Sequence, residues 1–461
     1  MNQIRILLNR CTENFLTVNI LALAIGLRIS FPALADNLSW TQFRGRDGNG
    51  IAPEGHAPLK WSESENIAWR TAIEGKGWSS PVVAENTVYL TTAVVVEANE
   101  QEAQAILEAT DLDPKQFKDR NVAKSVLLKL ISLDLTSGKP LASKQLISVE
   151  TPEPIHAMNS YASPTPMLDD DRIYCHFGTY GTFCLNRGDL SIRWERRLPL
   201  IHSVGPGSSP LVIDDILILI CDGVDRQYVT GLNKRTGETV WERDRPPMEA
   251  PSGDMKKAFC TPISVTDPSG RKQVICMGSQ WIVSYEPGTG NELWKLNHGK
   301  GFSIVPRPVY AEGVVYFSTG FGKPELWAVR ADGAGDVTDT NTVWIESRRI
   351  PARPSPLLVG ELLFIVSDDG IASCFDAKSG ESKWSERLGG NFSASPLLAD
   401  GKIFFCNHEG KTTVIRPSGS FAELANSQLD GQIMASPVAV DDSLLIRTDQ
   451  AMYRIQSENT P

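Results

Sequence analysis

The sequence lacks the patterns that would assign a function directly. It contains no His-Glu-x-x-His, Cys-x-x-Cys or Gly-x-Ser-x-Gly motif, so a zinc-protease site, a paired-cysteine zinc site and a serine-hydrolase elbow are all disfavoured. It also has no surplus of basic residues: 55 acidic residues face 45 basic ones, for a formal net charge of −10. Because nucleic-acid-binding proteins present a basic surface, we expect no nucleic-acid partner.

Long hydrophobic runs are missing as well. The longest apolar run, residues 15–27, is shorter than the ~20 residues needed to span a bilayer. Arg5 and Arg10 precede it, and Ala33-Leu34-Ala35 follows it. This order is typical of a secretory signal peptide. We therefore expect residues 1–35 to be cleaved after Ala35, a periplasmic or secreted protein, and no stable membrane insertion; a retained anchor is the alternative.

Cysteine is scarce, and no two cysteines are adjacent. Seven of the eight follow the predicted cleavage site, and an odd number cannot pair completely. Most recur at equivalent positions of a repeat, which favours small buried residues that pack between sheets. One exception is open: if Thr179-Tyr180 is a hairpin tip, Cys175 lies opposite Cys184, and a cross-strand disulfide is then an alternative.

What the sequence does contain is a repeat. A short apolar strand introduced by Ser-Pro, or by Thr-Pro or Arg-Pro, occurs eight times, about 40–50 residues apart except for a longer first interval, as four-stranded propeller blades require. The steps are Ser80-Pro81, Ser163-Pro164, Ser209-Pro210, Thr261-Pro262, Arg307-Pro308, Ser355-Pro356, Ser395-Pro396 and Ser436-Pro437. We predict an all-β protein, an eight-bladed β-propeller of four-stranded antiparallel blades.

Each repeat has the same internal order of turns and strands. Acidic pairs such as Asp170-Asp171, Asp214-Asp215 and Asp441-Asp442 fall in the first hairpin, where they are expected as solvated turn residues rather than calcium ligands. Asp368-Asp369 lies instead between a second and a third strand. A tryptophan in the fourth strand is expected to be buried between blades, at Trp69, Trp194, Trp241, Trp294, Trp344 and Trp384.

The ends of the repeat array predict how the ring closes. The last unit stops after three strands, whereas residues 66–70 form an orphan strand that carries Trp69. We expect residues 36–77 to complete the last blade, so that residues 36–461 form one propeller without an open edge. The first unit contains an insertion, residues 94–124, predicted as a small helical insertion with helices at 97–110 and 114–124.

These motifs resemble those of a known family. The Asp/Asn-x-x-x-Gly-x-x-x-Trp turn, together with the Ser-Pro strand, resembles the quinoprotein-type (PQQ-like) repeat of eight-bladed propellers, and Trp40–Gly45 is similar to a segment near the N-terminus of exported members. The resemblance implies either a pyrroloquinoline-quinone dehydrogenase or a non-enzymatic scaffold such as the propeller lipoprotein of outer-membrane assembly. The adjacent cysteine pair of many such dehydrogenases and the lipid-attachment cysteine of that lipoprotein are both missing here.

The loops that enter the innermost strands share one face of a propeller and carry most of the candidate ligand-binding residues. These residues are Lys76, Trp78, His156, Asn159, Tyr161, His202, His298, Lys300, Arg307, Arg353 and Asn391. The alternative is that these cations are merely solvated. A concave basic mouth would favour a carboxylate, an acidic peptide or an anionic glycan, with the insertion as a lid on the same face.

Two function classes follow. The favoured hypothesis is an exported, monomeric and non-enzymatic propeller that binds an acidic protein, peptide or anionic small ligand at this basic mouth, without a cofactor or metal. The alternative is a quinone-dependent oxidoreductase that holds pyrroloquinoline quinone with calcium, with Asp368 as a base. A hydrolase that uses the same mouth is a third and more remote possibility.

Overall fold

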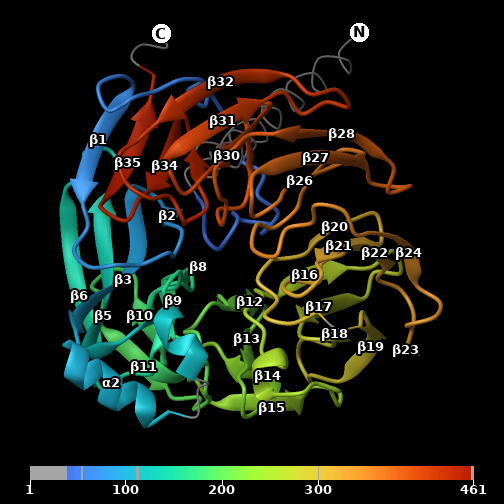
Figure 1. The fold of residues 1–461 in the computed structure, drawn as a ribbon, viewed down its shortest axis with the longest axis horizontal. Helices are drawn as coiled ribbons and strands as arrows, with labels where there is room; N and C mark the ends of the chain where they lie inside the picture. The colour runs from blue at the N-terminus through green and yellow to red at the C-terminus, as the bar shows by residue number, and fades with distance from the viewer. Residues whose placement is uncertain (1–38, 53–54, 111–113, 300, 458–461) are drawn as a thin grey trace, which may run out of the picture. The chain divides into compact units, whose positions relative to one another are not determined.

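Eight β-sheets surround a common centre in the computed structural model, which describes residues 39–52, 55–110, 114–299 and 301–457 (Figure 1). Within these residues, each of the eight sheets contains four antiparallel strands, and the chain runs through them in order. In the sheet that begins at Ile263 a short fifth strand, β23 (Gly335–Asp336), pairs parallel with the outermost strand. This confirms the predicted eight-bladed β-propeller. The blades are numbered here from 1 to 8 by the position of their innermost strand along the chain.

The strands of each blade are given from the innermost to the outermost. Blades 1 and 2 are β2 (Val82–Ala84), β3 (Thr87–Glu97), β5 (Ala123–Asp134), β6 (Pro140–Glu150) and β8 (Met167–Asp169), β9 (Arg172–His176), β10 (Thr182–Asn186), β11 (Ile192–Arg196). Blades 3 and 4 are β12 (Leu211–Ile213), β13 (Ile216–Asp222), β14 (Gln227–Asn233), β15 (Thr239–Asp244) and β16 (Ile263–Thr266), β17 (Lys272–Met277), β18 (Trp281–Tyr285), β19 (Glu292–Asn297).

The second half of the ring follows the same order. Blades 5 and 6 are β20 (Val309–Ala311), β21 (Val314–Ser318), β22 (Leu326–Arg330), β24 (Thr342–Glu346) and β25 (Leu357–Val359), β26 (Leu362–Val366), β27 (Ile371–Asp376), β28 (Ser382–Arg387). Blades 7 and 8 are β29 (Leu397–Ala399), β30 (Lys402–Cys406), β31 (Lys411–Ile415), β32 (Glu423–Gln428) and β33 (Val438–Val440), β34 (Ser443–Arg447), β35 (Ala451–Gln456), β1 (Ile67–Ala72).

Blade 8 is assembled from both ends of the chain. β1 pairs antiparallel with β35, so that Arg70 lies opposite Tyr453 and Ala72 opposite Ala451. In Figure 1 the blue β1 lies beside the red β35. The outermost strand of the last blade thus comes from the N-terminal side of the array, and this pairing covers the edge that β35 would otherwise expose.

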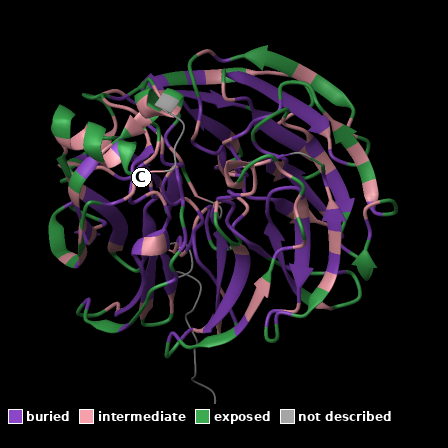
Figure 2. Ribbon diagram, turned by 60° about the horizontal axis from the view of Figure 1, so that its bottom comes forward, coloured by how far each residue is buried: buried purple, intermediate pink, exposed green. Residues whose placement is uncertain are grey.

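The inner strands are buried and the outermost strands are largely exposed, as Figure 2 shows. In β28, for example, Trp384 is half-buried and the other five residues are exposed. Five indole N–H groups donate to a backbone carbonyl of the following blade, in the pairs Trp69–Leu135, Trp194–Lys234, Trp241–Pro287, Trp344–Ala377 and Trp384–Ser418. Trp294 donates to Gln273 of its own blade. The predicted burial between blades is confirmed for Trp69, Trp194, Trp241 and Trp294, whereas Trp344 and Trp384 are half-buried.

The residue before each innermost-strand proline links neighbouring blades. Ser355 N–H donates to the Ser395 hydroxyl at 3.0 Å, and Ser395 N–H donates to the Ser436 hydroxyl at 2.9 Å. The same bond joins Ser80 to Thr165, Thr165 to Ser209, Ser209 to Thr261, and Arg307 to Ser355. In six blades the hydroxyl at this position therefore accepts a hydrogen bond from the buried backbone N–H of the preceding blade, whereas blade 5 has Arg307 there instead.

These bonds correct the step assigned to blade 2. The hydroxyl in the ring is that of Thr165, and β8 begins directly after Pro166. The step is therefore Thr165-Pro166 rather than Ser163-Pro164. Two consecutive Xaa-Pro pairs occur here, and the sequence alone offered no reason to prefer the second.

The proposed Cys175–Cys184 disulfide is wrong. Cys175 lies opposite Phe183, and Cys184 lies opposite Tyr174, because the turn at Gly178–Tyr180 shifts the register by one residue from the predicted one. A one-residue shift sends paired side chains to opposite faces of the sheet. Both cysteines are free and buried, as are the other five in the described residues, so the packing interpretation is confirmed.

The insertion is only partly helical. β3 and β5 continue the blade 1 hairpin into it, α2 (Glu100–Glu108) is capped by Asn99, and a 3₁₀ helix covers Pro114–Asp119. The predicted second helix is therefore wrong beyond Asp119, because β4 (Arg120–Asn121) pairs with β7 (Ile155–His156) in the loop that leads to blade 2. Within the described residues, no helix has the length and hydropathy required to span a membrane.

Candidate functional site

The central channel is crossed by a segment from near the N-terminus. We call residues 40–52 the plug. Trp40 pairs with Val83 in β2, and Thr41 O accepts a hydrogen bond from Leu168 N–H in β8. Gly50 O accepts one from Leu398 N–H in β29. Since these innermost strands belong to blades 1, 2 and 7, the plug spans the channel and closes it below.

Two buried arginines hold the plug in place. Arg307, only 1% exposed, donates to the backbone carbonyls of Phe43 and Pro262 and to the Gln42 side chain. Arg44 donates to Pro356 O at 2.8 Å. Burial lowers the pKa of Arg307 to about 10, and burial together with the charge of Arg307 lowers that of Arg44 to about 9. A Cβ at Gly48 would lie 2.3 Å from an Arg307 nitrogen, so this approach requires glycine.

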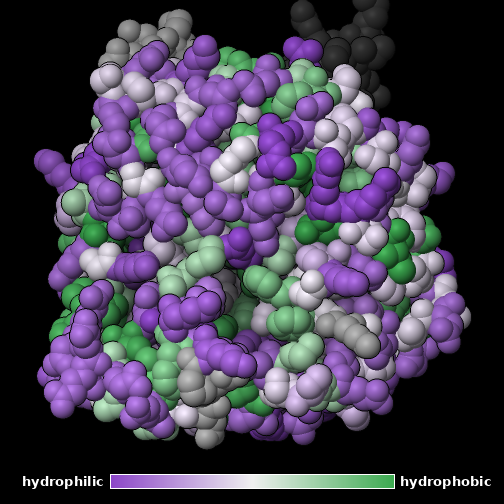
Figure 3. All heavy atoms as spheres, viewed as in Figure 1, coloured by the Kyte–Doolittle hydropathy of each residue, from purple (hydrophilic) through white to green (hydrophobic). Residues whose placement is uncertain are grey.

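Above the plug lies a cavity of about 680 Å³, with Phe43 of the plug in its wall. Figure 3 shows a hollow near the middle of this face, with hydrophobic residues beside it. We call this cavity the funnel. The plug lies at the lower end of the funnel, opposite the mouth.

The propeller repeat places the lining of the funnel in tiers. The lower tier consists of the ring residues Thr165, Ser209, Thr261, Ser355, Ser395 and Ser436. The upper tier consists of the residues two positions earlier in each blade, namely Trp78, Ser163, Gly207, Phe259, Val305, Arg353, Ser393 and Met434. Every blade thus contributes one residue to the upper tier, and Arg353 is the charged member of that tier.

The rim above the tiers carries three further basic side chains. Arg120 comes from β4, His156 from the paired β7, and Lys257 from the loop before β16, and all three line the funnel. Burial, reinforced by the charges of Arg120 and Arg353, lowers the pKa of His156. Burial also lowers the pKa of Arg120. The His156 Nδ1 accepts a hydrogen bond from Met158 N–H at 3.2 Å, which assigns the proton of the neutral ring to Nε2.

Acidic side chains balance part of this charge. Asp254 pairs with Lys257 and accepts a hydrogen bond from the Ser203 hydroxyl at 2.9 Å. Burial opposes ionisation of Asp254, but the hydrogen bond and charge of Lys257, the hydrogen bond from Ser203 and the charge of Arg120 together outweigh it, and the pKa of Asp254 is lowered. Asp368 lies 3.4 Å from Arg353 Nε. The mouth is therefore a mixture of ions in which Asp119, Asp254 and Asp368 balance Arg120, Lys257 and Arg353, rather than the strongly basic surface expected from sequence.

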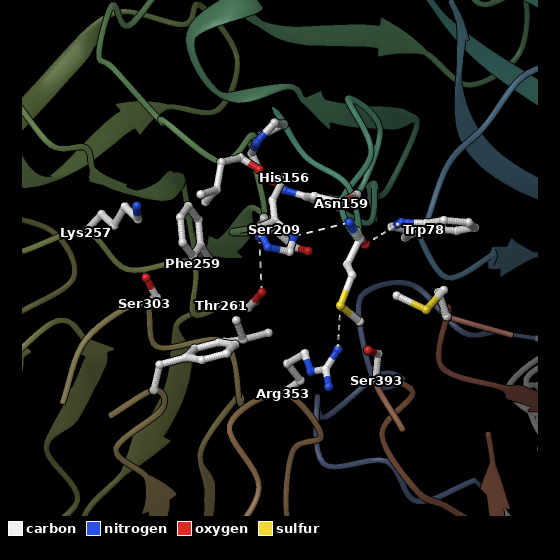
Figure 4. A pocket seen from close by; sticks show the side chains of 18 of the residues that line it. Trp78, His156, Asn159, Ser209, Lys257, Phe259, Thr261, Ser303, Arg353 and Ser393 are labelled. Carbon is white, nitrogen blue, oxygen red and sulfur yellow. Dashed lines mark hydrogen bonds between the residues drawn. The ribbon is translucent and has the colours of Figure 1, made fainter. Parts of the chain in front are cut away.

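The structure brings together four of the predicted site residues. Trp78, His156, Asn159 and Arg353 line the funnel, and Figure 4 shows them around it. Lys76 lies just outside, with its ammonium 5.1 Å from the Trp78 ring centroid. Lys300 lies outside the described residues.

The other predicted site residues that the structure describes lie outside the lining of the funnel. Tyr161 is buried and donates to Glu153 O, and His202 is buried with Nε2 accepting from Thr179 N–H. His298 is buried beside Gly278 O. Arg307 anchors the plug, so its assignment to the open mouth is corrected. Asn391 is exposed and bonded to Glu409.

Sequence reasoning placed the insertion on this face but missed most of the apolar lining and the individual residues that the insertion contributes. Phe259, Phe302 and Phe321 line the funnel, as do Gln116, Asp119 and Arg120. The spacing of two residues before each step was visible in the sequence and marks Phe259. By contrast, Arg120 reaches the funnel only because β4 pairs with β7, and no local pattern announces that pairing.

The described residues of the funnel do not form a set of calcium ligands. Among the described residues, no group of three or more His, Cys, Asp or Glu side chains is placed to hold a metal ion. Asp254 and Asp368, the acids nearest to suitable positions, are already paired with Lys257 and Arg353. The donor set therefore does not fit a quinone–calcium pair, although the cations of the rim suit carboxylates.

Comparisons with known proteins agree with this architecture. The family model described as outer membrane protein assembly factor BamB matches residues 59–241 and 129–386. Quinoprotein ethanol dehydrogenase from Pseudomonas putida is 25% identical over 174 residues, which is 37% of this chain and 26% of that protein. The chain aligns with about a quarter to a third of the length of the curated relatives it matches.

Solved structures share the fold. BamB from Moraxella catarrhalis has a TM-score of 0.52 at 15% identity and covers 74% of this chain and 93% of its own. Quinohemoprotein alcohol dehydrogenase from Comamonas testosteroni has a TM-score of 0.61 at 10% identity and covers 93% of this chain and 82% of its own. At such identities the likeness concerns the fold. Since the family model matches well over half of the sequence, this chain belongs to the PQQ-type repeat propeller family described as outer membrane protein assembly factor BamB.

Proposed function

We propose that this protein is an exported, non-enzymatic binding propeller whose funnel receives the anionic group of a ligand or partner. The observation that carries the proposal is the convergence of Arg120, Lys257 and Arg353 on one cavity with a closed lower end. A concave site with a few converging polar groups and apolar walls is the usual form of a binding pocket. The segment before Ala35 supports export, as does the name of the matched family.

The closed lower end limits what can bind. A continuous chain cannot pass through the channel, because the plug is bonded to innermost strands of blades 1, 2 and 7. The funnel therefore suits a small molecule, a chain end or a short protruding loop. Since Lys257 and Arg353 already have acidic neighbours, a ligand with one or two anionic groups suits it better than a polyanion.

Peptide binding tests the proposal. The probe is the peptide Leu-Glu-Leu-Glu with an amidated C-terminus and an uncharged fluorescent label, and the comparison peptide has Lys in place of Glu. We expect the acidic peptide to bind and the basic one not to. The double variant Arg120→Gln, Arg353→Gln should bind at least tenfold more weakly, which is about 1.4 kcal/mol.

A matched control removes a charge from the opposite face. Arg235 is exposed in the turn between β14 and β15, and Arg235→Gln should leave peptide affinity unchanged. Equal binding of the two peptides, or equal loss in the control, would contradict the proposal.

A second candidate is a quinone-dependent oxidoreductase, which the names of the matched dehydrogenases favour. Arg120 and Arg353 suit the carboxylates of pyrroloquinoline quinone, but the calcium ligands are not assembled in the described residues. Incubation with the quinone and calcium, followed by absorbance spectra and a dye-reduction assay with alcohols, separates the two. A binding propeller predicts no dye reduction; turnover would establish the enzyme.

A further inference from the structure

Arg353 stands alone as a charge in the upper tier. Its neighbours in that tier are Val305 of blade 5 and Ser393 of blade 7. The adjacency of blades 5 and 6 at this height is fixed by the hydrogen bond from Arg307 N–H to the Ser355 hydroxyl. A guanidinium in this setting is a specific anchor rather than one member of a basic surface.

The contacts of Arg353 leave one side of its guanidinium weakly satisfied. Asp368 accepts a hydrogen bond from Arg353 N–H at 3.1 Å and lies 3.4 Å from Nε, which fixes the base of the side chain. On the other side, Nη1 donates a hydrogen bond to the sulfur of Met158 at 3.4 Å (Figure 4). Met158 lies in the loop before blade 2, opposite blade 6 in the ring. A thioether is a weak acceptor, so a carboxylate that enters the funnel displaces it readily.

An aromatic surface lies on the blades next to Arg353. Phe302 and Phe321 of blade 5 have ring centroids 6.5 Å apart, and their backbones pair. Phe259 of blade 4 continues this surface, since its N–H donates to Ile304 O of blade 5. Phe321 is 37% exposed, which is unusual for so large an apolar side chain. The three rings line the same funnel as Arg353.

We propose that the ligand of the funnel is an amphipathic monocarboxylate. Its carboxylate replaces Met158 on Arg353, and its aryl or alkyl group lies against Phe259, Phe302 and Phe321. This inference rests on the proposed function and narrows it to one ligand class. A second carboxylate is disfavoured at Lys257, because Asp254 already pairs with that cation. The same chemistry occurs in a free small carboxylate and in a peptide C-terminus that ends in an apolar residue.

Calorimetry with matched acids and amides tests this inference on the mature full-length chain. The small pair is 4-phenylbutyrate and 4-phenylbutyramide, and the peptide pair is acetyl-Gly-Gly-Phe as the free acid and as the amide. We expect at least a tenfold preference for the acid in one pair or both. Binding of the small acid only indicates a free carboxylate as the natural source, and tight binding of the peptide acid indicates a C-terminus.

Variants assign the preference to the proposed residues. Arg353→Gln should remove the acid preference, and Arg353→Lys, which keeps the charge but not the planar fork, should keep part of it. Phe321→Ala should weaken 4-phenylbutyrate about threefold to tenfold, and Arg235→Gln should change nothing. Circular dichroism and thermal unfolding establish that each variant is folded.

Three results would overturn the inference: equal binding of acid and amide, an unchanged preference in folded Arg353→Gln, or no effect of Phe321→Ala. The amidated Glu-Leu peptide separates the two proposals. If it binds and depends on Arg120 and Arg353 while neither monocarboxylate binds, the proposed function stands and the monocarboxylate is wrong. If no probe binds, both are wrong.

Discussion

Two arginines from equivalent loops show how position within the repeat decides the role of a residue. Arg307 directly precedes the innermost-strand proline and points into the ring of blade-to-blade bonds, where it is buried against the plug. Arg353 lies two positions before that step, lines the funnel, and keeps its side chain 20% exposed. Composition alone could not distinguish them, because both are cations in an entry loop; the spacing from the proline does.

The position of a histidine also decides its role, and the buried His298 predicts that the fold loses stability in acid. Burial lowers the pKa of His298 to about 4 from the ordinary 6.5, so the folded state holds it neutral. Between about pH 4 and pH 6.5, His298 is protonated in the unfolded chain and neutral in the folded chain. The stability from neutral His298 is therefore present above about pH 6.5 and is lost as the pH falls towards 4.

Between pH 7 and pH 5, the free energy of unfolding should fall by about 2 kcal/mol more in the wild type than in His298→Gln. Chemical unfolding at both pH values, followed by tryptophan fluorescence, measures the difference. His56 is exposed, so His56→Gln serves as the control and should keep the wild-type pH dependence. An identical loss in His298→Gln and the wild type would contradict the assignment.

At the scale of the element, the turn between the third and fourth strands is fitted to the tryptophan of the preceding blade. Gly290, at φ +68°, packs on the Trp241 ring, and a Cβ there would lie 2.4 Å from ring carbons. From the sequence, the glycine was explained by the geometry of a tight turn. The structure adds that the same glycine leaves room for an indole from the previous blade.

This contact can be separated from backbone strain by a matched pair of substitutions. Gly401 also has a positive φ, +65°, but a Cβ there meets nothing within 4 Å. We expect Gly401→Ala to cost about 1 kcal/mol through strain alone, and Gly290→Ala to cost about 2 kcal/mol more through overpacking. Denaturant midpoints measure both. Equal costs would show that the indole yields without penalty.

Sequence patterns predicted elements better than registers. The Ser-Pro steps and the tryptophans predicted eight blades because each has a local physical reason. The residue of the step accepts a hydrogen bond from a buried backbone N–H, and the tryptophan packs the fourth strand against the next blade. The Cys175–Cys184 register and the step of blade 2 were wrong by one or two residues, since an irregular turn and a second Xaa-Pro pair left the frame open. The second helix failed because β4 pairs with a distant loop instead.

At the scale of the whole molecule, the candidate site exists only because the ring of eight blades is closed. β1 completes blade 8, the plug then crosses the channel, and the loops of all eight blades supply the upper tier. Four predicted residues were found in the funnel, but its aromatic surface and Arg120 were not predicted, because they depend on which loops meet over the channel. The positive charge of the mouth was overestimated, since acids from separate loops pair with the cations.

The central claim is that the funnel binds a carboxylate through Arg353, and a crystal structure with a bound probe tests it most directly. Crystals soaked in 4-(4-bromophenyl)butyrate would locate bromine by anomalous scattering. The account predicts bromine among Phe259, Phe302 and Phe321, with the carboxylate on the Arg353 guanidinium and Met158 displaced from it. Bromine elsewhere on the molecule, or an empty funnel at a saturating concentration, would contradict it.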